Sequence, residues 1–222
     1  MVMREDLIER ADALRARVNG HPEYCDEVVP QLIAMLSQTN DTDVLIALAA
    51  ALDAAWTGAA SLALLPHVAH ADDRVRLAVT QALPGGVESA EAKSRVANAL
   101  IRLADDESTD VRDWAVFGLG SILDLDTPPI REVLRSRLFD SDIGTRLEAL
   151  VGLAERRDPD VLMLIRDELG AETVDRLVVD AARAFADPSL VPTLRDLQTR
   201  WGEDTDLLER AIRACEAGEQ DP

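Results

Sequence analysis

The sequence is poor in the residues that carry much of the chemistry and packing in other proteins. Among 222 residues there is one lysine, Lys93, and there are two cysteines, Cys25 and Cys215, near opposite ends of the chain. Two cysteines placed in this way do not make the disulfide framework of a small secreted domain. Aromatic residues are only 3% of the chain. A core must therefore be built mainly from Ala, Leu, Val and Ile, as in helices packed on helices.

Long apolar runs and a targeting segment are also lacking. The longest uninterrupted apolar run, Val44 to Leu52, has nine residues, whereas a membrane helix needs about 20. The first residues, Met-Val-Met-Arg-Glu-Asp, are acidic within five positions and no apolar segment follows them, unlike a signal peptide. We therefore expect a cytoplasmic protein that does not contact a membrane.

Positive charge is scarce: 23 basic residues stand against 42 acidic ones, for a net charge of −19. Binding to a nucleic acid backbone requires clustered cations, so this balance argues against nucleic acid as a partner. It is compatible with a basic protein partner, or simply with solubility. A length of 222 residues favours one extended domain, residues 1–222, and by default a monomer.

What the chain does have is an internal repeat. Small or apolar residues recur at offsets of zero, four, seven and eight, which lie on one face of an α-helix. The frames start 31, 36, 34, 32 and 30 residues apart. Their members are Val44, Leu48, Ala51 and Leu52; Val75, Val79, Ala82 and Leu83; Val111, Ala115, Gly118 and Leu119; Thr145, Ala149, Gly152 and Leu153; Leu177, Ala181, Ala184 and Phe185; and Leu207, Ala211, Ala214 and Cys215.

The frame decides how a glycine-rich stretch, Gly118-Leu119-Gly120-Ser121-Ile122-Leu123, is interpreted. It is one residue short of a dinucleotide-binding fingerprint, which requires a strand, a glycine turn and then a helix. No strand pattern precedes it, and Gly118 occupies a frame position that holds small residues in every repeat. We therefore expect a packing glycine where two helices approach closely, and no nucleotide cofactor.

Each first helix is followed by a break and a second apolar helix. Thr127, Asp158 and Asp187 each precede a proline, which is a signature of a helix start. The second helices are predicted at 128–139, 159–169 and 188–200, and no segment alternates for long enough to be a strand.

The chain resembles the HEAT-like repeats of bacteria, including the short type of phycobilin-lyase relatives. The residues that carry the resemblance are Asp110-Val111-Arg112 with Ala115 and Gly118-Leu119-Gly120, Val75-Arg76, Leu150 to Ala154, and Asp187-Pro188 with Leu190 to Leu194. It covers about residues 41–215 and implies an all-α, right-handed α-solenoid of about five to six helix pairs. Residues 1–38 depart from the frame and are expected to form a helical cap. Repeats then fill 41–200, and a capping helix takes up 204–218.

Two columns of arginines follow from the frame. Arg76, Arg112 and Arg146 share one position of the first helices, whereas Arg135, Arg166 and Arg195 share one of the second helices. Equivalent positions line up in stacked repeats, so each set is either a ladder of ion pairs or a binding surface. The resemblance places second helices on the concave face, where guanidinium groups can hold carboxylates. Arg135, Arg166 and Arg195 are therefore candidate partner contacts.

Trp114 and Phe117 lie three residues apart on a predicted helix flank that carries Glu and Asp in other repeats. They are a candidate hot spot for a partner, or else they fill a local gap. Other constellations are weaker. His67 and His70 before Asp72 and Asp73 are expected to be a solvated helix end rather than a metal site, and Tyr24 with Cys25 has no histidine at a useful spacing.

We therefore expect a non-catalytic scaffold or adaptor that binds a protein along the concave solenoid surface, without metal or cofactor. A narrower version is an acidic immunity or antagonist protein for a basic partner. The rival is an enzyme of glycosylase or bilin-lyase type, because the resembling family includes both. The support for a glycosylase is weak: it is a single Asp beside a single Trp, Asp113 and Trp114. The resemblance itself does not distinguish among these functions.

Overall fold

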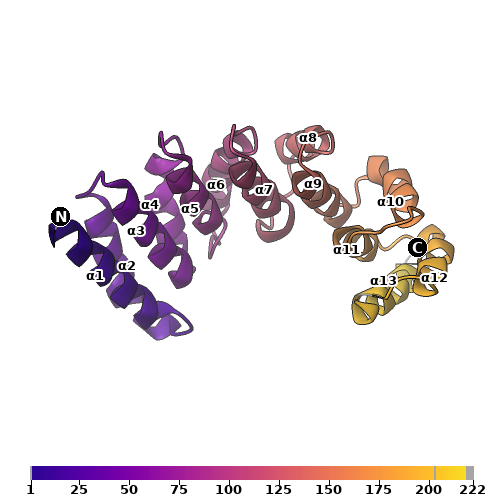
Figure 1. Cartoon of the computed structure of the whole chain (residues 1–222), viewed down its shortest axis with the longest axis horizontal. Coiled ribbons are helices and arrows are strands. Elements are labelled where there is room, and N and C mark those ends of the chain that lie inside the picture. Colours follow the sequence, from indigo (N-terminus) through magenta and orange to yellow (C-terminus); the bar gives the residue numbers. More distant parts are fainter. Residues whose placement is uncertain (1, 203, 219–222) are drawn as a thin grey trace. The chain divides into compact units, whose positions relative to one another are not determined.

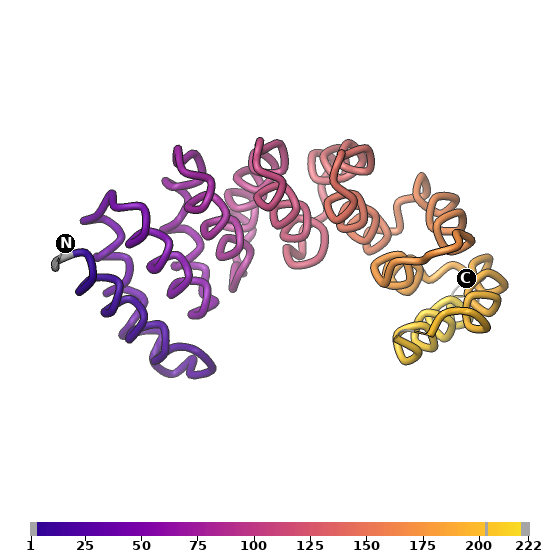
Figure 2. Tube along the Cα trace, in the orientation of Figure 1, coloured from indigo at the N-terminus to yellow at the C-terminus, as the bar shows by residue number. Residues whose placement is uncertain are grey.

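The computed structural model describes residues 2–202 and 204–218, and these residues form α-helices joined by turns, with no strand among them. Figures 1 and 2 show the helices in chain order. Their bounds are α1 Val2–Val18, α2 Cys25–Leu36, α3 Thr42–Ala55, α4 Gly58–Leu64, α5 Asp73–Ala82, α6 Ala90–Leu103, α7 Thr109–Phe117, α8 Pro128–Arg137, α9 Ile143–Glu155, α10 Leu162–Leu169, α11 Arg176–Phe185, α12 Val191–Gln198 and α13 Thr205–Ala217. The all-α prediction is confirmed. In the part of the chain that is described, no helix has the length and apolar character to cross a bilayer.

The chain divides into two compact units, Met1–Leu125 and Asp126–Pro222. In the first, α1, α3, α5 and α7 pack one on the next as one layer, and α2, α4 and α6 pack as a second layer beside it. In the second, α9, α11 and α13 pack in succession, and α10 packs against α12. The folding of 1–222 as one domain stays a prediction, and Met1, Glu203 and residues 219–222 of that range lie outside the described residues.

The N-terminal cap is a helix pair of the same kind as the repeats. The predicted cap, residues 1–38, contains α1 and α2, and α1 packs along α3 as α3 packs along α5. Its core side chains Ala11, Leu14 and Val18 are buried and follow helical spacing. The C-terminal capping helix predicted at 204–218 is α13.

First helices begin at the same point of the repeat. The residue three places before the frame start is the N-cap, and its side chain accepts a hydrogen bond from a backbone N–H of the first turn in α3, α5, α9 and α13. Asp is favoured at this position for that reason. The N-caps are Asp41, Asp72, Asp142 and Asp204. Frame positions zero, four and eight are buried in these four helices and in α7.

The predicted frame of α11 is wrong by one residue. Asp175 is the N-cap of this helix, so its frame starts at Val178 rather than Leu177. Val178 and Ala182 are buried, whereas Leu177 and the predicted Ala184 are half-exposed. The other two residues of the predicted frame, Ala181 and Phe185, are buried. Leu177 and Val178 both satisfy an apolar pattern, so that pattern alone does not fix the register. The capping residue Asp175 identifies Val178 as the start of the frame.

Gly118 is buried against side chains of the preceding helix pair. It ends α7 and begins a wider π-helical turn, Gly118–Ile122. A Cβ atom at this position would lie 3.3 Å from Leu100 Cδ1 and 3.5 Å from Pro84 Cγ. Its φ of −60° is one that any residue adopts, so glycine serves close packing here. A helix precedes it and no strand does, and the predicted packing role is confirmed.

The second helices of the second unit start as predicted. Pro128, Pro159 and Pro188 each stand at the first helical position. The last two begin short 3₁₀ turns, Pro159–Val161 and Pro188–Leu190, that lead into α10 and α12. Two C-termini come two residues earlier than predicted, at Arg137 and Gln198, where the chain turns towards the next capping residue.

Candidate functional site

The second-helix arginines contact the repeat that follows each of them. Arg135 Nη2 lies 2.6 Å from Asp158 Oδ2, and its Nε lies 3.3 Å from Asp160 Oδ2. Arg166 Nη2 donates to Ser189 Oγ at 2.7 Å. Arg195 Nη2 lies 2.6 Å from Glu216 Oε1. All three contacts are within the second unit and join one helix pair to the next. Those of Arg135 and Arg195 are the ion pairs of a ladder, whereas Arg166 donates to a hydroxyl.

Asp158 is the centre of the strongest of these contacts. Its carboxylate is fully buried and accepts hydrogen bonds from Arg131 Nη1 at 3.0 Å and from Arg135 Nη2 at 2.6 Å. It also accepts from the backbone N–H of Asp160, as a helix cap. Two guanidinium groups and a backbone donor compensate for the burial of one carboxylate. The side chains of Arg135 and Arg195 are still 46% and 64% exposed, and a partner contact by this column stays a prediction.

Trp114 and Phe117 lie against each other on the side of α7. Their ring centroids are 5.6 Å apart with an edge-to-face angle of 81°. Trp114 is 38% exposed and Phe117 is half-buried. The pair is therefore neither core nor fully exposed, and both of its predicted interpretations stay open.

Three of the residues considered for a metal or a nucleophile, His70, Asp72 and Cys25, form hydrogen bonds with the backbone. His70 Nδ1 accepts the backbone N–H of Asp72, which is the N-cap of α5. In the described part of the chain no three His, Cys, Asp or Glu side chains gather as metal ligands would. Both cysteines are buried and donate to backbone carbonyls, Cys25 to Ala55 and Cys215 to Ala182. Burial raises the pKa of the Cys215 thiol to about 11, so this thiol is protonated near neutral pH.

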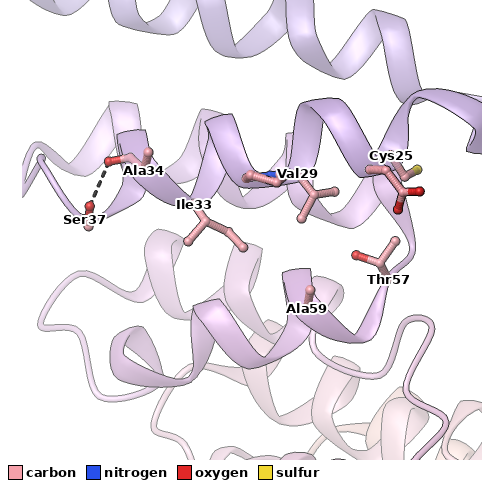
Figure 3. Close-up of a pocket in the computed structure, with 9 residues that line it drawn as sticks. Cys25, Val29, Ile33, Ala34, Ser37, Thr57 and Ala59 are labelled. Carbon is pink, nitrogen blue, oxygen red and sulfur yellow. Dashed lines mark hydrogen bonds between the residues drawn. The ribbon is translucent and has the colours of Figure 1, made fainter.

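A groove between α2 and α4 in the first unit is the candidate site that the sequence reasoning missed. It has a volume of about 460 Å³. Figure 3 shows Val29 and Ile33 of α2 facing Thr57 and Ala59 across it. Its walls are mostly apolar, and they are formed by Cys25, Asp26, Val29, Pro30, Ile33, Ala34, Ser37, Thr57 and Ala59.

The local structure explains why these side chains line one wall and stay partly exposed. On α2 the lining residues form two rows with a spacing of four, one from Cys25 to Ser37 and one from Asp26 to Ala34. Such rows are the ridges of a helix surface. On the other wall Thr57 is the N-cap of α4, and its Oγ1 accepts the backbone N–H of Ala60. Pro30, Ala34 and Ala59 are exposed, and Ile33 is half-exposed.

The groove coincides with the two longest stretches of the sequence without Asp, Glu, Lys or Arg. These are residues 54–71, which are 18 residues long and contain α4, and residues 28–40, which are 13 long and contain most of α2. In a chain that is 29% charged, an exposed surface built from two such stretches is unusual. The spacing of charged residues marks each wall of this site in the sequence, but it does not show that the two walls lie side by side.

One end of the groove is acidic. Asp26 is exposed at the start of α2 and makes no ion pair among the described residues. Burial raises the pKa of the neighbouring Cys25 thiol, and the negative charges of Asp26 and Glu23 raise it further. At the other end Ser37 Oγ donates to the carbonyl of Ala34, drawn dashed in Figure 3. The groove therefore runs from an anionic end to an uncharged one.

Comparison with known proteins matches part of the chain to a family. Residues 96–186, from α6 to the end of α11, match the family described as HEAT repeats. The resemblance inferred from the sequence is thus confirmed, and the α2–α4 groove lies before the matched residues.

The chain is similar to protein YibA of Escherichia coli, in strains K12 and O157:H7. The identity is 34% over 113 residues, which are 51% of this chain and 40% of the relative. The match thus spans less than half the length of these curated relatives. The solved structure of YibA has a TM-score of 0.64 at 23% identity, covering 96% of this chain and 82% of that one. An engineered protein of known structure has a TM-score of 0.55 at 19% identity, covering 97% and 92%. These likenesses agree with the predicted all-α solenoid fold of stacked helix pairs.

Proposed function

We propose that this HEAT-repeat protein is a non-catalytic interaction scaffold that binds a protein partner in the α2–α4 groove. The observation that carries the proposal is the partly exposed, mostly apolar surface of the groove, in whose lining Asp26 is the only charged residue. The central area of a protein interface is depleted of charge, whereas a solvated face is not. The groove has the composition of an interface centre, in a protein whose net charge is −19.

The polar groups of the groove favour binding over catalysis. Each hydroxyl or thiol in its walls already has a backbone partner: Cys25 donates to Ala55, Ser37 donates to Ala34, and Thr57 accepts from Ala60. A nucleophile needs a side-chain base within hydrogen-bond reach, and these groups are held by main-chain atoms instead. The groove therefore supplies shape and apolar area rather than reactive groups.

Capture of partners by full-length variants tests this function. Ala34→Glu places a charge on an exposed position of the groove, and Met163→Glu does the same on α10, where Met163 is 57% exposed. We expect at least one protein from a lysate of the source organism to be retained by the wild type and by Met163→Glu but lost with Ala34→Glu. Identical sets of retained proteins for all three would contradict the proposal, provided that circular dichroism shows equal thermal stability.

A further inference from the structure

We propose that the occupant of the groove is an amphipathic α-helix of a basic partner, with an Arg or Lys at the end of its apolar stripe that lies beside Asp26. This inference rests on the proposed function and specifies the chemistry of the partner. It follows from the shape of the groove, from the hydrogen bonds of its walls and from its charge.

The shape fits a helix about three turns long. The lining residues of α2 span Cys25 to Ser37, which at 1.5 Å per residue is roughly 18 Å. Their two rows at a spacing of four form ridges, and the furrow between neighbouring ridges accepts side chains of another helix at the same spacing. Side chains at i, i+3 or i+4 and i+7 of the occupant would then contact Val29, Ile33 and Ala59.

The walls offer little to an extended peptide. An extended segment needs partners for its own N–H and C=O groups, which a strand finds at the edge of a sheet. Here the walls are helices, and the backbone groups of Ala34, Ala55 and Ala60 that lie near the lining already pair with Ser37, Cys25 and Thr57. A helix satisfies its backbone internally and requires only apolar contact, so it suits this groove better.

The charge of the groove determines which end of the bound helix lies beside Asp26. Asp26 is the only charged residue of the lining, and it lies at the end that Cys25 and Thr57 share. The first unit carries 20 acidic against 10 basic residues, so its field attracts a cationic segment. A cation at one end of the occupant's stripe pairs with Asp26, whereas a carboxylate there would be repelled.

Selection from a random peptide library tests the inference without knowledge of the partner. The probe is a phage-displayed library of random 16-residue peptides, selected on the full-length wild type and depleted on Ala34→Glu. We expect the enriched peptides to carry apolar residues at i, i+3 or i+4 and i+7, with Arg or Lys at one end. By fluorescence anisotropy their Kd should rise about tenfold or more with Ala34→Glu and stay within about twofold with Met163→Glu, because Met163 does not line the groove.

Asp26→Asn tests whether a cation at one end of the bound helix pairs with Asp26. An Arg-bearing peptide should bind the wild type up to about fivefold more tightly than its Gln counterpart, as for an exposed ion pair, and this preference should disappear with Asp26→Asn. Three results overturn the inference: no groove-dependent peptide is enriched, the enriched apolar residues alternate with period two, or the preference survives Asp26→Asn. If one of these results is obtained but the wild type still captures a partner that Ala34→Glu loses, the proposed scaffold function is supported. Only the inference that the partner binds as a basic, amphipathic helix is then wrong.

Discussion

At the scale of single residues, the clearest repeated contact is made by the arginine one place after the frame start. Arg76 donates through Nη1 to the carbonyls of His70 and Ala71, and Arg112 and Arg146 donate in the same way to the carbonyls six and five residues before them. These carbonyls belong to the turn that leads into each helix. The first-helix arginines therefore fix the acidic turns of their own repeats. The predicted ladder of ion pairs between repeats is seen at Arg76, which pairs with Asp106.

Arg76→Ala should destabilise the protein by about 3 kcal/mol. Arg76 also pairs with Asp106 through Nε and Nη2 at 2.7 and 2.8 Å, and both side chains are only 10% exposed. Removing one partner leaves a buried charge without compensation. Arg74→Ala is the matched control on the same helix. Because the Arg74 side chain is 62% exposed, its removal should lower the free energy of unfolding by less than about 1 kcal/mol. Urea unfolding measures both, and equal effects would refute the account of this pair.

The same pair predicts a dependence of stability on pH. Burial by itself would raise the pKa of Asp106, but hydrogen bonds from Arg76 and from the backbone N–H of Ser108, with the nearby guanidinium charges, lower it below its usual value. A lowered pKa in the folded state means that ionised Asp106 stabilises the fold above the unfolded pKa of about 4, and that this stability is lost as pH falls through the folded pKa. Asp106→Asn should therefore lose stability at pH 7 and show a shallower decline below about pH 5. Parallel curves for the two proteins would contradict this.

Gly118→Leu should destabilise the fold by about 2 kcal/mol or more. The added side chain would have to displace Leu100 and Pro84, which lie within 3.6 Å of the position of a Cβ atom, and overpacking of this kind strains a core. Gly202→Leu is the control, because nothing lies within 4 Å of its Cβ position. Thermal unfolding followed by circular dichroism compares the two variants, and an unchanged Tm for Gly118→Leu would be the contrary result.

At the scale of helices, the sequence predicted the elements well and one register badly. Apolar spacing located the first helices of the repeats. The capping residue before each of Pro128, Pro159 and Pro188 located the second helices of the second unit. The frame of α11 failed because Leu177 and Val178 fit an apolar pattern equally well. Only the packed structure shows that Asp175 caps the helix and that Val178 faces the core.

The corrected register makes its own prediction. Val178→Ala removes two methyl groups from a side chain that is 1% exposed and should destabilise the protein by about 2 kcal/mol. Leu177→Ala removes more atoms from a half-exposed side chain and should lower the free energy of unfolding by less than about 1 kcal/mol. Chemical denaturation of the two variants decides between the frames, because the uncorrected register requires the opposite order.

At the scale of the whole molecule, the distribution of charge carries information that periodicity does not. A search for apolar spacing finds the buried face of most first helices of the repeats, since burial dominates the pattern. It gives no weight to residues 28–40 and 54–71, where the exposed face also lacks charge. The arginine columns and the Trp114–Phe117 pair could be named from the sequence. The groove could not, because it requires α2 and α4 to lie side by side.

Photo-crosslinking in cells of the source organism tests the central claim most directly. A photoreactive amino acid is placed at position 34 in the groove, at position 59 on its opposite wall, and at position 163 as the control, all of which are exposed. If the groove binds a partner, positions 34 and 59 should give the same dominant crosslinked protein and position 163 should not. No crosslink at 34 and 59, or the same products from all three positions, would contradict the account.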